Sequence, residues 1–413
     1  MTEVISPALL LGRVVAPASK SYLQRAIAIA SLCEDECRIH GYTPSADVDA
    51  ALTIVSQLGA SVSISDGTIA ISKGEITKNE IILSCGESGL SARMFSAIAA
   101  TYENKITVTG KGSLLERPFH MVQHALIQLG KSAHLTSGKL PLKLSGTMHS
   151  DEITIDASES SQLLTGLLIA LPMLEGKSII YVHHLRSIPY IQMTLDILSH
   201  YGISINHTNF QRFEIEGNQR PKAPEYIVEG DWSAASFLLV GGAIAGRVSV
   251  SGLNPNSAQA DRAILDALQL AGAKVEWEHD EVSCSRSTLH AFHFDATHCP
   301  DLFPPLAALA ACCKGTSTIK GTERLHHKES DRATTICATL RSLGITVTIE
   351  NHTMHITGGA IRAASLSSFN DHRIAMMAAV LGCVADYPIS ITESKAVNKS
   401  YPNFFCDIAS LRQ

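Results

Sequence analysis

The stretch VDAALTIVSQLGASVSISDGTIAIS, from Val48 to Ser72, contains the pattern that decides the fold of this chain. Its apolar residues from Val48 to Leu58 recur at helical spacing, and Gly59 follows where a glycine commonly ends a helix. Beyond the glycine, apolar residues alternate on both sides of Asp66-Gly67, a dipeptide typical of a tight hairpin turn. The stretch therefore predicts an amphipathic helix followed by two short antiparallel strands.

This pattern repeats along the whole chain. The glycines that end the expected helices are 70 to 72 residues apart, at Gly59, Gly130, Gly202, Gly272 and Gly344. Dividing the 413 residues by a period of about 71 gives about 5.8, so we expect six repeats. The sixth helix is visible at Phe404–Leu411 with no hairpin after it, and we expect the extended segment Val4–Val15 to supply the missing strands. Both chain termini are then expected in one domain.

A second recurring element lies half a period away and consists of a capping residue, an apolar helix and a strand. The expected caps are 69 to 73 residues apart, at Ser19, Ser88, Ser158, Asp231, Asp301 and Asn370. Each repeat is thus predicted to be a small sheet with two helices. Three repeats bury three largely uncharged helices within a domain of about 200 residues. We predict an α/β fold of six repeats in two domains.

The composition excludes several classes of protein. Hydrophobic residues make up 45% of the chain and charged residues only 17%, unlike an intrinsically disordered chain or a coiled coil. The net charge of -6 provides no broad basic surface for nucleic acid or an anionic membrane. Apolar runs stay shorter than the roughly 18 residues of a membrane span, and Met1–Gly12 lacks the basic start of a secretory signal. We expect a cytoplasmic protein that binds neither nucleic acid nor a membrane.

The cysteines predict neither disulfides nor a metal site. Ten cysteines in 413 residues are too sparse for a disulfide scaffold, and several lie in apolar, helix-like runs. Cys33 and Cys37 are four residues apart, but no second Cys or His pair follows at zinc spacing. We therefore expect reduced thiols in the core.

The starts of the buried helices carry polar groups suited to anions. Helix N-termini present unpaired N–H groups and partial positive charge, so several that converge on one cleft make a strong anion site. Lys20, Ser21 and Arg25 share one helical face suited to a phosphate or carboxylate. The run from His327 to Arg332 alternates in sign, which is typical of a solvated face but also permits a buried network lining a cleft. These features point to small anionic ligands.

Ten motifs in one order resemble a known enzyme family. They are PASKSYLQRA (17–26), GESGLSAR (86–93), ERP (116–118), SESSQ (158–162), SIPY (187–190), VEGDWSAAS (228–236), HCPD (298–301), HKESDR (327–332), NDHR (370–373) and AVNKSYPNFF (396–405). Together they are similar to the 3-phosphoshikimate 1-carboxyvinyltransferase, or EPSP synthase, family. The match spans nearly the whole chain.

The resemblance implies a fold and a reaction. The family has two domains of three repeats around buried parallel helices, an inside-out α/β barrel, with the substrates between the domains. Here these would be 19–228, and 1–18 plus 229–413, the last repeat being completed by the N-terminus, with crossovers near 13–18 and 225–231. The reaction transfers the enolpyruvyl group of phosphoenolpyruvate to the 5-hydroxyl of shikimate 3-phosphate and releases phosphate. It belongs to chorismate and aromatic amino acid biosynthesis and uses no metal or other cofactor.

The resemblance also implies site residues. By similarity, phosphoenolpyruvate is bound by Lys20, Gly89, Arg117, Gln162, Arg332, Arg373 and Lys399. Shikimate 3-phosphate is bound by Ser21, Arg25, Ser160, Ser161, Gln162, Ser187, Tyr190, Asp301 and Lys328. Asp301 resembles the base toward the attacking hydroxyl, and Glu329 and Lys20 resemble the groups that move the proton at carbon.

Some residues depart from the family pattern. Glu87 stands where Asn is common, Leu90 where Thr usually follows the second glycine, and Arg324 where Asn is frequent. Glu87 adds negative charge near an anion pocket, and Leu90 removes a hydroxyl. Both changes bear on phosphoenolpyruvate affinity.

Three alternatives remain open at this point. UDP-N-acetylglucosamine enolpyruvyl transferase usually has Asn where Ser21 stands and a reactive Cys in a loop that has none from Tyr102 to Pro118 here. A non-catalytic anion-binding paralogue is disfavoured because the acid, base and lysine positions are retained. RNA 3'-phosphate cyclase, also built from such repeats, is disfavoured by the acidic balance. We expect a monomer.

Overall fold

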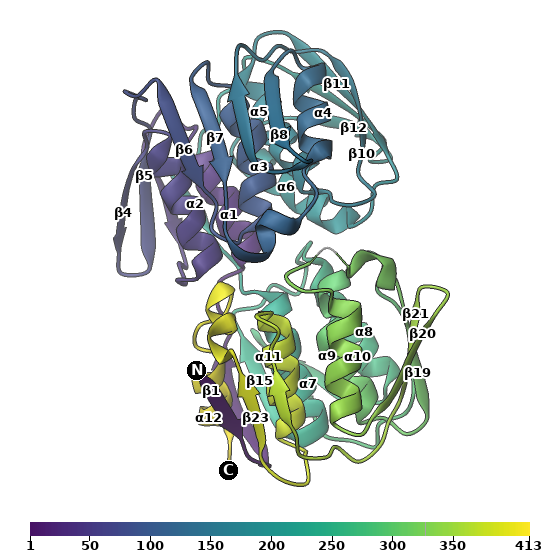
Figure 1. Cartoon of the computed structure of the whole chain (residues 1–413). Helices are drawn as coiled ribbons and strands as arrows, with labels where there is room; N and C mark the ends of the chain where they lie inside the picture. The colour runs from purple at the N-terminus through teal and green to yellow at the C-terminus, as the bar shows by residue number, and fades with distance from the viewer. Residues whose placement is uncertain (327) are drawn as a thin grey trace. The chain divides into compact units, whose positions relative to one another are not determined.

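The computed structural model describes residues 1–326 and 328–413, and His327 of the predicted charge run lies outside the described residues. The chain forms two compact units. The middle unit is Lys20–Val228, and the terminal unit combines Met1–Ser19 with Glu229–Gln413 (Figure 1). Both ends of the chain therefore belong to the terminal unit.

The middle unit consists of three repeats of two helices and one sheet. Its helices are α1 (Lys20–Ala30), α2 (Ala46–Gln57), α3 (Gly89–Ala100), α4 (His120–Gln128), α5 (Gln162–Ala170) and α6 (Ile188–His200). The first sheet has the order β14 (Glu225–Ile227), β3 (Cys37–His40), β5 (Thr68–Ser72) and β4 (Ser61–Ser65). The second has β6 (Glu80–Ser84), β7 (Lys105–Thr109), β9 (Lys139–Ser145) and β8 (Ser132–Thr136). The third has β10 (Glu152–Asp156), β11 (Lys177–His183), β13 (Arg212–Glu216) and β12 (Asn206–Thr208).

The terminal unit repeats this plan. Its helices are α7 (Trp232–Ala245), α8 (Ile264–Leu270), α9 (Phe303–Ala311), α10 (Arg332–Ser342), α11 (His372–Gly382) and α12 (Phe404–Leu411). One sheet has the order β16 (Lys274–Glu278), β17 (Glu281–Ser285), β15 (Gly246–Ser251) and β2 (Leu10–Val15). The next has β18 (His293–Asp295), β19 (Thr316–Lys320), β21 (Thr353–Thr357) and β20 (Thr346–Glu350). The last has β1 (Thr2–Ile5), β23 (Ile389–Thr392) and β22 (Ser365–Ser367).

The predicted fold class is confirmed, and so is the role of the repeating glycines. The quoted stretch forms α2 and the hairpin of β4 and β5, with Ser65 paired to Thr68 across the turn. All five glycines that follow a helix have a left-handed φ, between 76° and 97°. A residue with a Cβ is strained there, so glycine ends each helix and turns the chain into the hairpin.

The chain crosses between the two units twice. At each crossing, the last strand before it pairs within the unit that the chain is leaving. In the second repeat, β6 and β7 precede and follow α3 and pair in parallel. In contrast, β2 precedes α1 but pairs with β15, and β14 precedes α7 but pairs with β3. The expectation that all of Val4–Val15 completes the last repeat is therefore wrong for Leu10–Val15. Only β1 joins the last sheet. Because β14 pairs with β3, one edge of β15 is without the strand that precedes α7, and β2 pairs with that edge instead.

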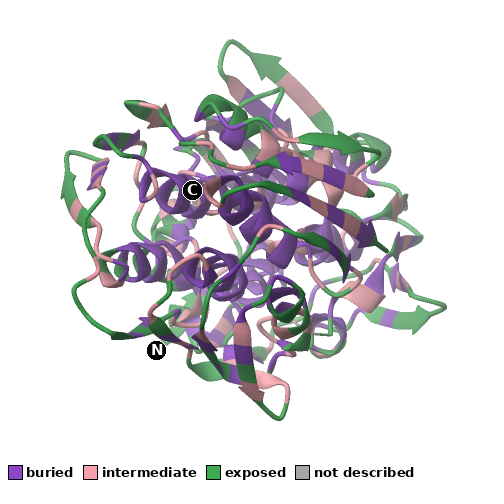
Figure 2. Ribbon diagram, turned by 90° about the horizontal axis from the view of Figure 1, so that it is seen from above, coloured by how far each residue is buried: buried purple, intermediate pink, exposed green. Residues whose placement is uncertain are grey.

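The first helix of each repeat forms the core of its unit. Every residue of α3, α9 and α11 is buried, and α5 and α7 have one residue each that is not. Figure 2 shows buried helices, in purple, in the interior. In the middle unit α3 packs on α5, where a Cβ on Gly166 would lie 2.6 Å from the carbonyl oxygen of Met94. In the terminal unit α7, α9 and α11 pack on one another. The scarcity of charge in the sequence reflects these helices.

The expected helix caps are only partly right. Ser88 and Asp231 are N-caps whose side chains accept backbone N–H groups of α3 and α7. Ser158, Asp301 and Asn370 are not caps. The N-cap positions of α5, α9 and α11 are held by Ser161, Leu302 and Asp371. Local sequence does not separate a cap from a nearby polar residue that has a tertiary partner, and Asp301 has such partners.

Among the residues that the structure describes, no helix has both the length and the hydrophobicity needed to cross a bilayer.

Candidate active site

In the middle unit, Lys20 is paired with a carboxylate that the sequence prediction missed. Its Nζ lies 2.9 Å from Oδ2 of Asp47 in the first turn of α2, and both side chains are largely buried. One turn along α1, Gln24 donates through Nε2 to the carbonyl of Asp47 and to the hydroxyl of Ser88. These bonds join the starts of α1, α2 and α3. The sequence feature that could have pointed to Asp47 is its position as an acidic residue in the first turn of a helix.

Gly89, Arg117 and Gln162 lie together where α3 and α5 begin. A Cβ on Gly89 would be 2.7 Å from Nη1 of Arg117 and 3.5 Å from Oε1 of Gln162. The same Oε1 accepts a 3.1 Å hydrogen bond from Nη1 of Arg93, a buried arginine that the prediction omitted. The Arg93 guanidinium also lies 5.2 Å from the ring centre of Phe119. Two guanidinium groups and a helix N-terminus therefore concentrate positive charge at Gly89.

Arg25 joins α1 to α6 and contacts two other predicted residues, Ser21 and Tyr190. Its Nε donates to Oγ1 of Thr194 at 2.9 Å, and its Nη2 donates to the Tyr190 carbonyl at 3.2 Å. Its Nη1 donates to the Ser21 carbonyl at 2.8 Å. Burial lowers the pKa of Arg25 to about 10, so the group stays charged at neutral pH. Ser187, just before α6, has a left-handed φ of 58°, a strained backbone of the kind found at binding sites.

Ser160 and Ser161 lie directly ahead of α5. The Ser160 hydroxyl accepts the backbone N–H of Gln162 at 3.2 Å. Ser161 is buried at the N-cap position, and its side chain does not cap the helix. Both hydroxyls are therefore at a helix start where anionic ligands are favoured.

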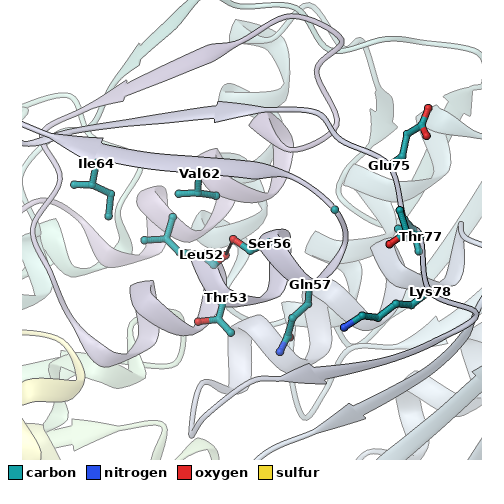
Figure 3. A pocket seen from close by; sticks show the side chains of 11 residues that line it. Leu52, Thr53, Ser56, Gln57, Val62, Ile64, Glu75, Thr77 and Lys78 are labelled. Atoms are coloured by element: carbon teal, nitrogen blue, oxygen red, sulfur yellow. Dashed lines mark hydrogen bonds between the residues drawn. The ribbon is translucent and has the colours of Figure 1, made fainter.

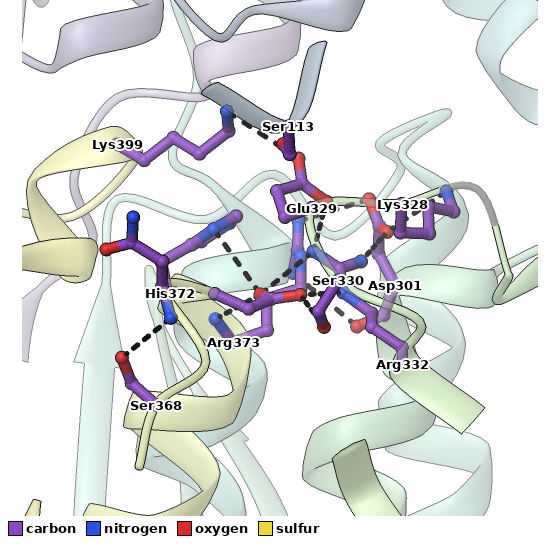
Figure 4. Close-up of polar contacts among 12 residues, drawn as sticks. Ser113, Asp301, Lys328, Glu329, Ser330, Arg332, Ser368, His372, Arg373 and Lys399 are labelled. Carbon is purple, nitrogen blue, oxygen red and sulfur yellow. Dashed lines mark hydrogen bonds and ion pairs between the residues drawn. The ribbon is translucent and has the colours of Figure 1, made fainter. Parts of the chain in front are cut away.

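In the terminal unit, Arg332 contacts three carboxylates, of which Asp301 and Glu329 are labelled in Figure 4. This residue begins α10 and is 1% exposed. Its Nη1, Nη2 and Nε lie 2.7, 2.6 and 2.8 Å from the side chains of Asp301, Glu329 and Asp371. Burial acts to lower the pKa of Arg332, but the three carboxylates raise it above its usual value. Asp371, part of the NDHR motif, was not among the predicted site residues.

Asp301 is held by three cations. It lies in the 3-10 segment Pro300–Leu302, with Oδ1 2.7 Å from Arg332 Nη1 and 3.4 Å from Lys328 Nζ. Its Oδ2 is 3.1 Å from Nη2 of Arg373 (Figure 4). Burial on its own raises the pKa of Asp301, but the three cations together hold it well below its usual value. In this state the carboxylate is ionised and weakly basic.

Glu329 lies between two cations of the same cluster. Its Oε2 accepts from Arg332, and its Oε1 is 3.9 Å from Nζ of Lys399 in the 3-10 segment Ser394–Lys399. Burial lowers the pKa of Lys328, although Asp301 partly opposes this. The cluster thus combines four cations with three carboxylates. The cations are Lys328, Arg332, Arg373 and Lys399, and the carboxylates are Asp301, Glu329 and Asp371.

The arrangement suits anionic substrates and proton transfer. Six predicted residues meet in this one cluster of the terminal unit, although up to 98 positions separate them in the sequence (399 minus 301). Buried arginines bind phosphate or carboxylate bidentately, and neighbouring carboxylates can accept or donate protons. Within the described residues, no three His, Cys, Asp or Glu side chains gather as a metal site does.

A groove elsewhere in the middle unit contains none of the predicted residues. It lies between α2, β4 and the segment that follows the hairpin, and side chains such as Leu52, Gln57 and Lys78 line it (Figure 3). The predicted site residues of the middle unit therefore lie at the helix starts and not in this groove.

Solved structures share this fold. The EPSP synthase of Acinetobacter baumannii superposes with a TM-score of 0.84 at 24% identity, covering 100% of this chain and 98% of that one. The enolpyruvyl transferase NikO of Streptomyces tendae gives 0.79 at 15% identity, covering 99% and 97%. These likenesses define the fold class of the protein as that of the enolpyruvyl transferases.

Sequence comparison identifies the family within this class. The family model for EPSP synthase (3-phosphoshikimate 1-carboxyvinyltransferase) matches residues 5–408. Proteins named 3-phosphoshikimate 1-carboxyvinyltransferase are 38% identical in Methanocella arvoryzae, over 100% of this chain and 99% of that protein, and 34% in Clostridium novyi, over 98% and 95%. The chain belongs to the EPSP synthase family, as the motifs predicted.

Proposed function

We propose that this chain transfers the enolpyruvyl group of phosphoenolpyruvate to the 5-hydroxyl of shikimate 3-phosphate, using the two clusters described above. The reaction yields 5-enolpyruvylshikimate 3-phosphate and phosphate for chorismate and aromatic amino acid biosynthesis. The observation that carries the proposal is the terminal-unit cluster, in which one partly buried carboxylate, Asp301, is held by Arg332, Arg373 and Lys328. Family membership supplies the substrates.

The cationic groups bind the two polyanions. For phosphoenolpyruvate we assign Lys20, Gly89, Arg117, Gln162, Arg332, Arg373 and Lys399. For shikimate 3-phosphate we assign Ser21, Arg25, Ser160, Ser161, Gln162, Ser187, Tyr190, Asp301 and Lys328. Arg93 joins the first set, because its Nη1 lies 3.1 Å from Gln162 and it would meet a Cβ on Gly89 at the same distance. Arginine forks match the phosphate and carboxylate groups in both geometry and charge.

The chemistry requires two proton movements and then an elimination. Asp301 accepts the proton of the 5-hydroxyl while the oxygen bonds to C2 of phosphoenolpyruvate, and C3 receives a proton from the groups that we assign to this transfer, Glu329 and Lys20. The tetrahedral adduct then loses a methyl proton to the same groups as the bond to the phosphate oxygen breaks. The arginines stabilise the phosphate and carboxylate charges throughout.

Substrate binding prepares Asp301 for its role as a base. In the unliganded protein three cations hold its pKa below the usual value, which makes it a poor proton acceptor. Substrate phosphate and carboxylate groups that bind Arg332, Arg373 and Lys328 partly neutralise these three cations, so that the cations interact less strongly with Asp301. The pKa of Asp301 therefore rises when both substrates are present, and the base becomes effective only in the ternary complex.

We further propose that the protein acts as a monomer in the cytoplasm, without nucleic acid or a membrane as partner. The acidic net charge of -6 supports the part of the proposal that concerns nucleic acid and anionic membranes. Sedimentation of the purified protein at the mass of one chain is the expected result, and a stable dimer would contradict it.

A phosphate-release assay tests the function. Phosphate is expected from phosphoenolpyruvate only when shikimate 3-phosphate is present, together with one equivalent of the enolpyruvyl product by mass spectrometry. Release with UDP-N-acetylglucosamine in place of shikimate 3-phosphate would identify the other transferase. Binding of both substrates without turnover would identify a non-catalytic paralogue.

A further inference from the structure

Asp261 is a buried carboxyl group to which the reaction described above gives no role. It lies in the 3-10 segment Ala260–Ala263 ahead of α8 and is 3% exposed. Its Oδ1 is buried and has no hydrogen-bond partner among the described atoms. Burying a carboxyl oxygen without a partner is costly, so the position calls for an explanation beyond packing.

The surroundings of Asp261 connect it to the active site. Arg373 donates through Nη1 to the Ser233 hydroxyl and through Nη2 to Asp301. The segment that carries Asp261 packs on α7, which carries Ser233, and the Ser233 hydroxyl favours the charged form of the Asp261 carboxyl. Arg373 therefore acts on two carboxyl groups, on Asp301 through a direct ion pair and on Asp261 through its nearby positive charge.

The charged and titratable neighbours of Asp261 come from several elements. They are Asp301 from the segment before α9, Arg373 from α11, Asp231 from the N-cap of α7, and Cys299 ahead of Pro300. Arg262 on its own segment is exposed and donates to the Pro255 carbonyl. Burial and the negative charge of Asp301 raise the pKa of Asp261 to about 7, although Arg373 and Ser233 act in the opposite direction. Of these two carboxyls, Asp301 is therefore the one that stays ionised around pH 7 in the unliganded protein.

We propose that Asp261 is a positioning residue that controls how Arg373 divides its positive charge between phosphoenolpyruvate and Asp301. The inference rests on the roles proposed above for Arg373 and Asp301. When Asp261 is protonated, the charge of Arg373 is fully available to the substrate and to Asp301, so phosphoenolpyruvate binds more tightly and Asp301 is a weaker base. When Asp261 is ionised, it takes a share of that charge. Substrate binding then weakens, and the basicity of Asp301 rises.

The proposal predicts that KM and kcat rise together with pH. In the wild type, KM for phosphoenolpyruvate and kcat should both increase through a midpoint near pH 7, by about tenfold if the interaction is worth one pKa unit. Asp261→Asn keeps the shape of the side chain and removes the titration. This variant should match the wild type near pH 5.5. Near pH 8.5 it should have a lower KM and a lower kcat by the same factor.

Asp266→Asn on α8 is the matched control, because it makes the same charge change five residues away at an exposed position. It should keep the wild-type profile. If Asp261 had a purely structural role, Asp261→Asn would instead have a lower kcat and a lower melting temperature at every pH. Its KM for phosphoenolpyruvate would then not fall near pH 8.5. That result, or a profile of Asp261→Asn that titrates like the wild type, would overturn the inference.

Two further variants keep the test decisive. If Asp261→Asn does not fold, Ser233→Ala is measured instead, since loss of the hydroxyl disfavours the ionised carboxyl and should move the midpoint to higher pH. An unmoved midpoint, or a wild-type profile that is flat between about pH 6 and 8, refutes the inference. Arg373→Gln distinguishes an error in the assignment of Arg373 as a phosphoenolpyruvate ligand from an error in the role of Asp261. If it leaves KM for phosphoenolpyruvate unchanged, the ligand assignment fails. If it raises KM while Asp261→Asn has no effect, only the role of Asp261 fails.

Discussion

Replacing Arg332 with glutamine should destabilise the terminal unit by about 3–5 kcal/mol at about pH 8, the cost of removing one partner from buried ion pairs. Arg332 is 1% exposed and has carboxylate oxygens of Asp301, Glu329 and Asp371 within 2.8 Å. A glutamine amide donates two hydrogen bonds and carries no charge, so three carboxylates are left with less compensation. The loss therefore exceeds that expected for an ordinary surface substitution.

The destabilisation should depend on pH with a definite sign. The pKa of Asp301 is lowered in the folded protein, so its ion pairs stabilise the fold above the unfolded value of about 3.9. That contribution is lost as the pH falls through the folded pKa. Without Arg332 the folded pKa moves up and the contribution shrinks. The difference between wild type and variant should thus be largest above about pH 5 and should narrow toward about pH 3.

Tryptophan fluorescence measures this effect in the relevant unit. The chain has two tryptophans, and both Trp232 and Trp277 belong to the terminal unit. Denaturant titrations followed by their emission report the unfolding of that unit. Arg341→Gln, at an exposed position of the same helix, is the control and should change stability by about 0.5 kcal/mol or less. If Arg332→Gln loses no more stability than this control at about pH 8, the buried network does not stabilise the unit as argued.

Other substitutions test the remaining parts of the structure. Asp301→Asn should lower kcat by about 10²–10⁴-fold, the usual contribution of a general base, and a variant within about threefold of the wild type in steady-state assays would exclude that role. The same variant should also lose less stability than the wild type between about pH 5 and 2 in acid unfolding followed by fluorescence, because the ion pairs of a carboxylate with a lowered pKa are lost in that range. Gly89→Ala places a Cβ 2.7 Å from Nη1 of Arg117 and should raise KM for phosphoenolpyruvate by about tenfold, corresponding to about 1.4 kcal/mol of binding; an unchanged KM would show that Arg117 yields without loss. Gly166→Ala brings a Cβ to 2.6 Å from the Met94 carbonyl and should destabilise the middle unit by about 1–3 kcal/mol, measured by circular dichroism, whereas a stabilised variant would contradict the close packing of α3 on α5.

Much of the fold could be predicted because its signals are local. Gly59 and its four counterparts end helices through a left-handed φ, and the hairpin after α2 follows from alternation around Asp66-Gly67. The helix at Phe404–Leu411 was placed at its observed bounds. These features depend on a few neighbouring residues, so a period of about 71 residues was visible without any knowledge of contacts.

The capping residues were harder to predict because several polar residues compete at each helix start. Asp371, and not Asn370, accepts the backbone N–H of Arg373. At the fifth start the competing partner is tertiary, since the Asp301 carboxylate pairs with Arg332 and Arg373 instead of capping α9. An ion pair with two buried guanidinium groups is stronger than a cap, and neither guanidinium is near Asp301 in the sequence.

The sequence by itself determined that this protein consists of repeated helix-and-hairpin segments, because helical periodicity, strand alternation and left-handed glycines act over fewer than about ten residues. Its motifs also identified the family. Only the tertiary structure decided which strands pair, since the exchange of β2 and β14 depends on which sheet edges are open once the units have folded. The tertiary structure also brought Asp47 to Lys20 and Asp261 to the neighbourhood of Arg373. Interactions between charges depend on distance through the folded interior, where burial strengthens them, and separation along the chain does not reveal that distance.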